Sequence, residues 1–405
     1  MTGLNENYHC PPEQYYHKSQ QSIDRALRCG IMTADDVQLL DKFLTRFKLR
    51  VSPGRYRACT TYLCASRRFI PVEYRQVTDD ILLKLFSDLR YAKREDGKPY
   101  TRNTISGMSR INKQLFTFLH EEGLVSIQER TLKQLTVITP DYHTKSDDDV
   151  YSAEEIQQMI DAAKSSKYKA YIGMLYETGG RSIELSNLKW KDLTFCDWGV
   201  SVNLTDTKTD KMRTVPIVTY AKYLYDWMNQ YHPGEPEGEN FVFVTPRGTP
   251  FRYASVSARL KIIAQEVGIE KPMTLHRFRH SRITHSLRAG MSETICKKAY
   301  WGNETTTMIG TYGHLTSQDI RDEVLRISGV EIPKNTTMDG PKPITCPNCH
   351  RVMPPGTKVC ECGKILDEQM SKTMEGTIKT LDEWIKRHSD SDLLGFLSQI
   401  KKMSE

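Results

Sequence analysis

A short polar segment, ITPDYHTKSDDDV at residues 138–150, divides the chain into two stretches with different patterns. It combines a proline, a serine and three successive aspartates, which is typical of an exposed linker. The chain has 405 residues, too many for one ordinary hydrophobic core. The sequence therefore predicts two domains joined by a linker at residues 138–149, followed by a smaller appendage.

The stretch before the linker has a helical pattern. Apolar residues recur at three-to-four spacing in DDVQLLDKFLTRF, DDILLKLFSDL and TISGMSRINKQLFTFLHEEG, and strand-like runs are few. Residues 33–137 are therefore predicted to form a small helical domain, and residues 1–32 an N-terminal extension.

The stretch after the linker mixes helices with a hairpin. Ser152 precedes Glu155 by three residues, a capping box that marks a helix start. VSVNL and RTVPIV, β-branched and partly alternating, flank the polar tip TDTKTDKM, a hairpin pattern. Beyond Lys271 the pattern is again helical until Pro333. The predicted fold class is mainly α with a small β component (α+β), and the second domain spans residues 150–332.

Four of the ten cysteines cluster near the end of the chain, and the others are scattered. Cys346, Cys349, Cys360 and Cys362 give Cys-x-x-Cys, ten residues and Cys-x-Cys, which is close to a zinc ribbon at residues 343–365. His350 is an alternative ligand; reduced thiols or a redox pair are alternatives to a metal. Such a closed site would be structural, so no cofactor is expected for catalysis. Residues 366–405 are predicted to form a helical tail.

The net charge of +7 favours an anionic partner. No window approaches the ~18 apolar residues of a membrane span, and the first residues lack the apolar core of a secretory signal. We therefore expect a cytoplasmic protein without a membrane partner.

The second domain carries the residues that phosphodiester cleavage without a metal requires. This chemistry needs a nucleophile, fixed cations around the phosphate and a proton donor for the leaving oxygen. The chain offers, in order, Arg181, Lys208, His276, Arg279, His280 and Tyr312. Each alone is compatible with an ordinary solvated or core role, and only the ordered set points to a reaction.

This ordered set resembles the tyrosine recombinase (phage integrase) family over roughly residues 150–320. Arg181 matches the first family box together with Glu184, and the basic hairpin ending in Val-Pro places the active lysine at Lys208 rather than Lys211. HRFRH supplies His276 and Arg279, while His280 is expected to support the helix. The family usually has histidine or tryptophan nine residues before the tyrosine, where this chain has Asn303. Asparagine can donate a hydrogen bond to phosphate but cannot exchange a proton as imidazole can.

The resemblance implies that Tyr312 attacks a backbone phosphate and forms a 3′-phosphotyrosyl bond, without ATP. Arg181 and Arg279 would clamp the phosphate and Lys208 would protonate the leaving 5′-oxygen. His276 would bond the phosphate or assist proton transfer, and Glu184 would orient the cluster. The implied partners are double-stranded DNA with specific sites and further copies of the chain in a homo-tetramer.

In the family a helical domain closes over the DNA, a role that fits residues 33–137. Basic residues recur there with aromatics in RFKLRVSPGRYR, ASRRFI and RYAKRE, and Arg102 and Arg110 are candidates to face the duplex. A merely solvated basic face is the alternative.

We therefore expect a site-specific recombinase, such as the integrase of a virus or mobile element, with the ribbon faintly suggesting an archaeal source. Chromosome-dimer resolution or topoisomerase-like relaxation would use the same chemistry. A zinc-ribbon DNA-binding protein that keeps the fold without the activity is the remaining alternative, motivated by Asn303.

Overall fold

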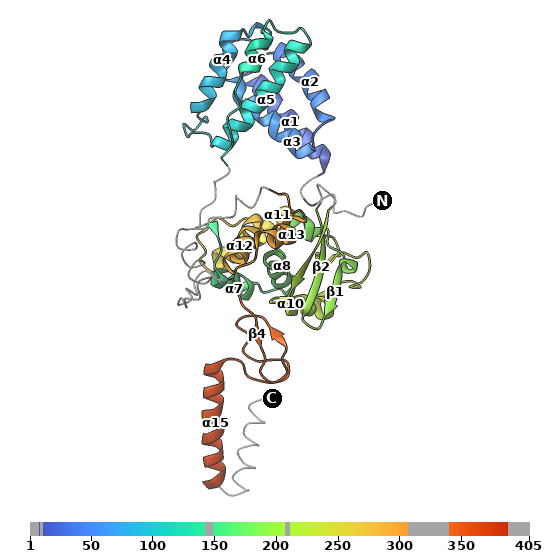
Figure 1. The fold of residues 1–405 in the computed structure, drawn as a ribbon, viewed down its shortest axis with the longest axis vertical. Helices are drawn as coiled ribbons and strands as arrows, with labels where there is room; N and C mark the ends of the chain where they lie inside the picture. Colours follow the sequence, from blue (N-terminus) through green and yellow to red (C-terminus); the bar gives the residue numbers. More distant parts are fainter. Residues whose placement is uncertain (1–7, 9–10, 142–148, 207–210, 307–339, 388–405) are drawn as a thin grey trace. The chain divides into compact units, whose positions relative to one another are not determined.

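The computed structural model describes residues 8, 11–141, 149–206, 211–306 and 340–387. The chain forms two compact units, Glu6–Thr144 and Lys145–Glu405, the latter joined by Met1–Asn5 (Figure 1). Two predicted catalytic residues, Lys208 and Tyr312, lie outside the described residues.

The first unit is helical. Its helices are α1 (Pro12–Arg28), α2 (Ala34–Lys48), α3 (Pro53–Arg67), α4 (Asp79–Asp88), α5 (Arg102–Glu121) and α6 (Glu129–Gln134), with 3-10 turns η1 (Tyr74–Gln76) and η2 (Leu89–Tyr91).

Side-chain caps and one long core helix define this unit. Thr33 and Asp36 form a capping box at the start of α2, and Thr101 caps α5. Helix α5 buries Leu115 and Phe116 completely, as its apolar three-to-four spacing predicts. Helix α1 packs on α3, and its Ile23 belongs to the same core, so part of the expected N-terminal extension lies within the helical unit.

The second unit combines helices with a small sheet. Its elements are α7 (Ala153–Ala162), α8 (Ser166–Glu177), α9 (Ser182–Ser186), η4 (Trp190–Asp192), β1 (Leu193–Cys196), β2 (Gly199–Thr205), β3 (Met212–Ile217), α10 (Ala221–Asp226), η5 (Trp227–Tyr231), α11 (Tyr253–Glu266), α12 (Leu275–Arg288) and α13 (Glu293–Trp301). Helix α7 begins at the capping box of Ser152 and Glu155, as predicted.

The predicted hairpin is confirmed, and it belongs to an antiparallel sheet of order β1-β2-β3. Val202 faces Val215 in the register of β2 and β3. In β3 burial alternates strictly, with Arg213, Val215 and Ile217 buried. Pro216 has no N–H to donate, which an edge strand such as β3 tolerates.

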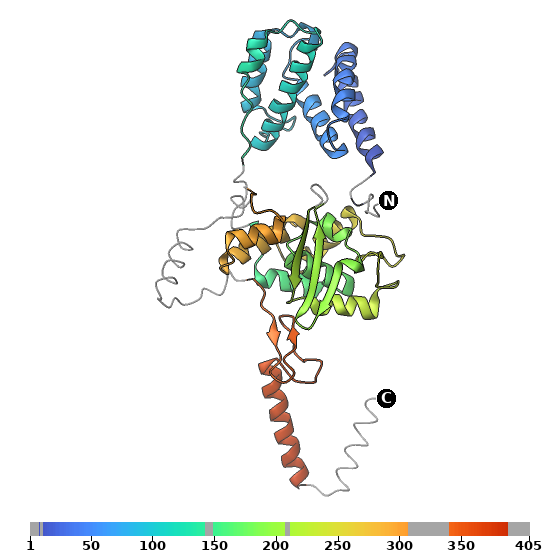
Figure 2. The same ribbon diagram turned by 45° about the vertical axis from the view of Figure 1, so that its right-hand side comes forward.

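Helix α8 is the central element of the second unit, in contact with α7, α10 and α12 (Figures 1 and 2). Every residue from Ala170 to Glu177 is buried. Glu177, although ionisable, accepts hydrogen bonds from the backbone N–H groups of Val218, Thr219 and Tyr220 at 2.8–2.9 Å. This buried carboxylate therefore fixes the connection from β3 to α10 against α8, and the chain leaves α8 at a defined position just before Arg181.

The last described elements are β4 (Ile344–Thr345), β5 (Val352–Met353) and α15 (Glu368–Arg387). Strands β4 and β5 pair antiparallel and carry the four-cysteine segment between and after them. The predicted fold class, mainly α with a small β component, is confirmed. Within the described residues, no helix is both long and apolar enough to span a membrane.

Candidate active site

Arg181 lies in the turn between α8 and α9, and two carboxylates hold its guanidinium. Its Nη1 donates to Oε1 of Glu184 at 2.8 Å and to Oδ2 of Asp206 at 2.5 Å. Burial opposes the charged form, but the two carboxylates outweigh it and raise the pKa of Arg181. The charged Arg181 side chain is held in one orientation, and 30% of it is exposed.

Glu184 is buried between two arginines. Its Oε2 accepts from the backbone N–H of Arg181 at 2.7 Å and from Nη2 of Arg213 at 2.5 Å. The Arg213 side chain is 2% exposed, and that of Glu184 is fully buried. A buried carboxylate needs such compensation, because leaving a charge unpaired in the interior is costly. Glu184 thus connects Arg181 to strand β3.

Asp206 connects Arg181 to the base of the β2–β3 hairpin. Asp206 follows the last residue of β2, and its N–H donates to the carbonyl of Lys211 at 2.9 Å. The two residues that flank segment 207–210 are therefore bonded to each other, and one of them is ion-paired with Arg181. Lys208 belongs to the segment between them, outside the described residues.

Arg279 is 1% exposed, and backbone carbonyls hold its guanidinium. Nη1 donates to the carbonyl of Gly179 at 2.6 Å, and Nη2 donates to that of Tyr300 at 2.7 Å. The guanidinium carbon lies 5.0 Å from the centroid of the Trp301 ring. Arg279 therefore joins the turn that carries Arg181 to the end of α13.

His276 and His280 lie one turn apart on α12. His276 is exposed, whereas His280 is buried, and their rings meet edge to face with centroids 4.8 Å apart. Residues three apart on a helix share a face, so His276 and Arg279 lie on the same side of α12.

Asn303 follows the left-handed Gly302 that ends α13. Its Oδ1 accepts from the N–H of Thr305 at 3.1 Å and from the Thr305 hydroxyl at 2.9 Å. A Cβ on Gly302 would lie 3.5 Å from the carbonyl oxygen of Met212 in β3. The φ of +63° favours glycine at this position, and the ordinary van der Waals contact with Met212 places Asn303 near the hairpin.

The structure thus brings together the turn that carries Arg181, the base of the hairpin and the helix that carries His276 and Arg279. Hydrogen bonds to Glu184 and Asp206 link Arg181 to α9 and to the base of the hairpin. Hydrogen bonds from Arg279 link the start of α12 to the turn before Arg181 and to the end of α13. Lys208 and Tyr312 themselves lie outside the described residues.

Comparison with known proteins agrees with this arrangement. A family model described as the phage integrase family matches residues 150–319. Residues 150–319 of the chain belong to the phage integrase family, the tyrosine recombinases.

Two curated relatives and one solved structure indicate the range of this similarity. Transposase A from transposon Tn554 of Staphylococcus aureus is 29% identical over 182 residues, 42% of this chain and 50% of that protein. Tyrosine recombinase XerD of Listeria innocua is 29% identical over 224 residues, 52% of this chain and 71% of that protein. A lambda integrase tetramer bound to a Holliday junction has a TM-score of 0.52 at 16% identity, covering 68% of this chain and 76% of that one.

The matched region is only part of each protein. This chain spans about half the length of the transposase relative, and the lambda integrase similarity supports the fold alone. Both curated relatives come from bacteria, so they give no support to an archaeal source.

Two residues of this integrase-family site escaped the sequence analysis, Asp206 and Arg213. Arg213 occupies the same alternating positions as Val215 and Ile217 in RTVPIV. An arginine on the buried face of a strand requires a buried acceptor, so the alternation itself was a usable signal. Asp206 gave no comparable signal, because an aspartate beside a hairpin tip is ordinary turn composition.

The four cysteines of the tail come together. Their Sγ atoms lie within 4.8 Å of one another, with 3.6 Å between Cys346 and Cys362 and 3.5 Å between Cys349 and Cys360. Tetrahedral zinc with Zn–S bonds of about 2.3 Å requires sulfurs about 3.8 Å apart, so the cluster fits zinc. Donation from the backbone N–H of Lys364 and from the Asn348 side chain lowers the pKa of Cys362 to about 6, whereas the pKa of Cys360 is raised to about 12, so the four thiols do not share one protonation behaviour. His350 is exposed and is not part of the cluster.

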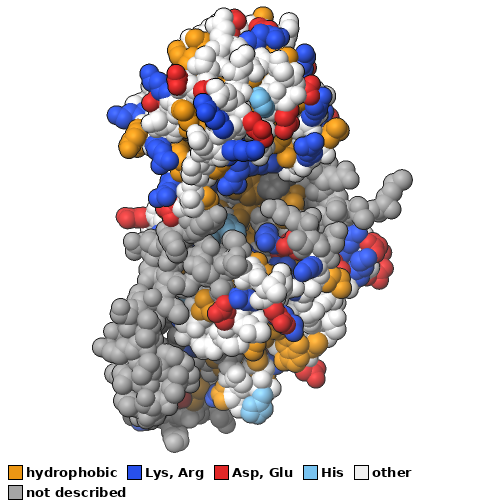
Figure 3. All heavy atoms as spheres, turned by 45° about the horizontal axis from the view of Figure 1, so that its top comes forward, with side chains coloured by type: hydrophobic (Ala, Val, Ile, Leu, Met, Phe, Trp, Pro, Cys, Tyr) orange, Lys and Arg blue, Asp and Glu red, His pale blue; other side chains and the backbone are white. Residues whose placement is uncertain are grey.

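The helical unit of this family member separates structural from accessible arginines. Arg67 is buried and donates from Nε and Nη2 to Asp36 at 3.0 and 2.6 Å, so this basic residue of ASRRFI is part of the core and is not exposed for a phosphate contact. Arg102 and Arg110 are exposed on α5. Figure 3 shows many Lys and Arg side chains on the visible face of this unit.

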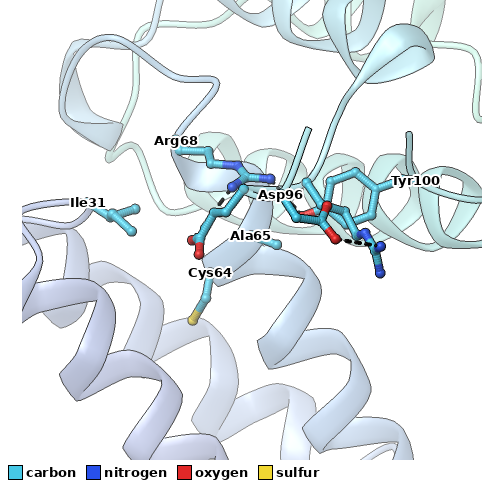
Figure 4. Close-up of a pocket in the computed structure, with 8 residues that line it drawn as sticks. Ile31, Cys64, Ala65, Arg68, Asp96 and Tyr100 are labelled. Atoms are coloured by element: carbon cyan, nitrogen blue, oxygen red, sulfur yellow. Dashed lines mark hydrogen bonds and ion pairs between the residues drawn. The ribbon is translucent and has the colours of Figure 1, made fainter. Parts of the chain in front are cut away.

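A pocket of about 380 Å³ also lies in the helical unit (Figure 4). Its charged side chains pair with one another. Arg68 lies 3.6 Å from Glu95, and Arg94 lies 2.8 Å from Asp96. The Arg68 guanidinium also donates to the Tyr100 hydroxyl at 2.7 Å. Because positive and negative side chains pair here, the charge of the pocket rim is balanced, and the pocket does not have the character of an anion-binding site.

Proposed function

We propose that this chain is a site-specific DNA recombinase that cleaves and rejoins strands through a 3′-phosphotyrosyl bond to Tyr312. The observation that carries the proposal is the bond from Arg279 to the carbonyl of Gly179, two residues before Arg181. It joins the two arginines that the family chemistry requires through one short turn. Two guanidinium groups near one phosphate would offset the charge of a pentavalent transition state.

The remaining roles follow from the same chemistry. Tyr312 would attack phosphorus, and the bond from phosphorus to the 5′-oxygen would break, with Lys208 giving that oxygen its proton. His276, exposed beside Arg279, would bond a nonbridging oxygen or accept the tyrosine proton. Asn303 would donate one hydrogen bond through its amide. In the second step the free 5′-hydroxyl of a partner strand attacks the phosphotyrosine and releases Tyr312.

We further propose that the reaction serves a mobile element. The transposon relative supports this assignment, as it is 29% identical to this chain over 182 residues. The proposed partners are double-stranded DNA carrying recombination sites and three further copies of the chain, as in the lambda integrase tetramer. In the tail, Cys346, Cys349, Cys360 and Cys362 would hold one structural zinc.

The test is covalent capture on DNA. The full-length chain is incubated with a pool of nicked suicide duplexes that carry a randomised core, and protein-linked DNA is isolated under denaturing conditions and sequenced. We expect a covalent complex enriched for one core sequence, with the DNA attached through its 3′-phosphate. Tyr312→Phe should abolish it, because phenylalanine has no nucleophilic oxygen.

Tyr231→Phe is the matched control, since Tyr231 is an exposed tyrosine of the same unit. This variant should form the complex at the wild-type level. A complex that persists in Tyr312→Phe would overturn the choice of nucleophile. Sequence-specific binding without any covalent complex would instead favour the non-catalytic DNA-binding alternative.

A further inference from the structure

The hydrogen bonds of Arg181 are distributed unevenly over its guanidinium. Nη1 donates to two carboxylates, to Glu184 at 2.8 Å and to Asp206 at 2.5 Å. Among the described residues, no acceptor bonds Nε or Nη2 of Arg181. A guanidinium binds phosphate through two parallel N–H groups, and the Nε–Nη2 edge is the only complete pair that the carboxylates leave open.

We propose that Asp206 is a positioning residue for strand cleavage. Together with Glu184 it holds Nη1 of Arg181, so that the Nε–Nη2 edge is presented to the phosphate. This inference rests on the proposed function and adds a residue to its machinery. Asp206 itself touches Arg181 and not the phosphate, so its effect on the reaction passes through the orientation of one side chain.

Arg181, Arg213, Glu184 and Asp206 form one cluster of ion pairs. Its two positive and two negative charges balance, so Asp206 neutralises a charge that Glu184 alone would leave uncompensated. With Glu184 alone as anchor, the Nη1 group would have one fixed bond, and the guanidinium could rotate about its long side chain. Two acceptors on one nitrogen remove that freedom before DNA binds, which lowers the entropic cost of the transition state.

The position of Asp206 in the chain adds a second constraint. It lies at the base of the hairpin, bonded through its own N–H to Lys211, and its side chain is 8% exposed. The carboxylate is therefore held by the backbone of the sheet and is not a mobile surface group. An anchor for Arg181 needs this rigidity, because a displacement of about 1 Å is enough to slow a positioned reaction by about 100-fold.

The test separates DNA affinity from the rate of cleavage. Asp206→Ala and Asp206→Asn are compared with the wild type for the dissociation constant of a suicide duplex and for single-turnover formation of the covalent complex at saturating DNA. We expect Asp206→Ala to slow cleavage about 10- to 100-fold, as loss of a supporting contact usually does. Its DNA affinity should be unchanged or tighter, since a negative charge near the phosphate has been removed.

Asp206→Asn is the conservative variant. Asparagine keeps one oxygen that can accept from Nη1, so cleavage should recover to within about fivefold of the wild-type rate. Asn203→Ala is the matched control on the same hairpin, where Asn203 bonds the Thr214 hydroxyl at 2.7 Å and does not reach Arg181. This control should cleave at the wild-type rate.

Three outcomes would overturn the inference. Wild-type cleavage by Asp206→Ala would show that Arg181 needs no second anchor, and faster cleavage would show that Asp206 restrains Arg181. A loss of affinity and thermal stability parallel to the loss of rate would indicate a structural role only. Failure of the wild type to form any covalent complex would instead refute the proposed function itself, before any Asp206 variant is compared.

Discussion

Asn303 has a local contact in the structure, and in the proposed reaction it has a second contact with the phosphate. Its Oδ1 accepts from Thr305, while its amide N–H groups are the donors that would reach a phosphate. Asn303→Asp keeps the acceptor and removes the donors. We expect unchanged thermal stability and cleavage slowed about 100-fold, the usual cost of one donor to a developing oxyanion.

The measurement pairs a melting curve with single-turnover cleavage of a suicide duplex. Asn303→Ala is the companion variant, because it removes both contacts and should lose about 1 kcal/mol of stability as well as the rate. If Asn303→Asp cleaves as fast as the wild type, Asn303 serves only the local turn.

Arg67 and Arg110 belong to the same basic helical unit but should respond differently to substitution. Arg67→Met breaks a buried ion pair and leaves Asp36, which is fully buried, without its partner. We expect a loss of about 3–5 kcal/mol in the free energy of unfolding, measured by urea denaturation, with no change in the salt dependence of DNA binding.

Arg110→Ala is the opposite case, because Arg110 is exposed on α5. If it contacts a phosphate, its removal should weaken DNA binding and reduce the slope of log affinity against log salt by about 1, with unchanged stability. Equal stability losses in Arg67→Met and Arg110→Ala would contradict this division.

At the scale of elements, the ribbon of β4 and β5 is too small to fold on apolar burial alone. Its core cluster consists of Cys346, Met353 and Cys360. We therefore expect one zinc per chain by native mass spectrometry, and chelation should unfold this segment, because the bound zinc would supply its folding free energy. Hydrogen exchange at residues 344–365 should accelerate after chelation.

Cys360→Ser should give the same result without a chelator, and Cys196→Ser, outside the cluster, should leave zinc content unchanged. A metal-free chain whose ribbon is protected from exchange to the same degree would contradict a structural zinc. Neither result should alter cleavage chemistry directly, because a four-thiolate site has no open coordination position.

Elements were predictable from the sequence where the signal is local. The capping box at Ser152 fixed the start of α7, and alternating β-branched residues fixed the β2–β3 hairpin. Arg67 and Arg213 could not be placed in the same way, because their carboxylate partners lie 31 and 29 positions away in the chain. Tertiary pairs of this kind depend on how helices and strands pack, which local periodicity does not encode.

In the candidate site, too, residues in local motifs could be predicted from the sequence and residues brought in by tertiary packing could not. The order of Arg181, His276 and Arg279 was readable, because each lies in a short motif with fixed spacing. Asp206 was not, because only folding of the hairpin onto the α8–α9 turn brings it to Arg181. A supporting residue contributed by a different element is visible only once the elements are packed.

At the scale of the molecule, the two units have separate hydrophobic cores, one within residues 23–135 and one within residues 151–278. Separate cores predict that the chain does not unfold in one all-or-none step. Leu115 in α5 and Leu175 in α8 are both fully buried, one in each core. Truncating either to alanine should cost its own unit about 2–5 kcal/mol.

We expect calorimetry of the full chain to show two transitions, with Leu115→Ala lowering the melting temperature of one and Leu175→Ala that of the other. Covalent complex formation at low temperature should persist in both variants, because neither residue belongs to the cluster around Arg181. A single transition that both substitutions shift equally would mean that the two cores fold as one cooperative body. In that case the helical unit would contribute stability to the catalytic unit as well as a surface for DNA, and Leu115→Ala would weaken cleavage on heating as strongly as Leu175→Ala does.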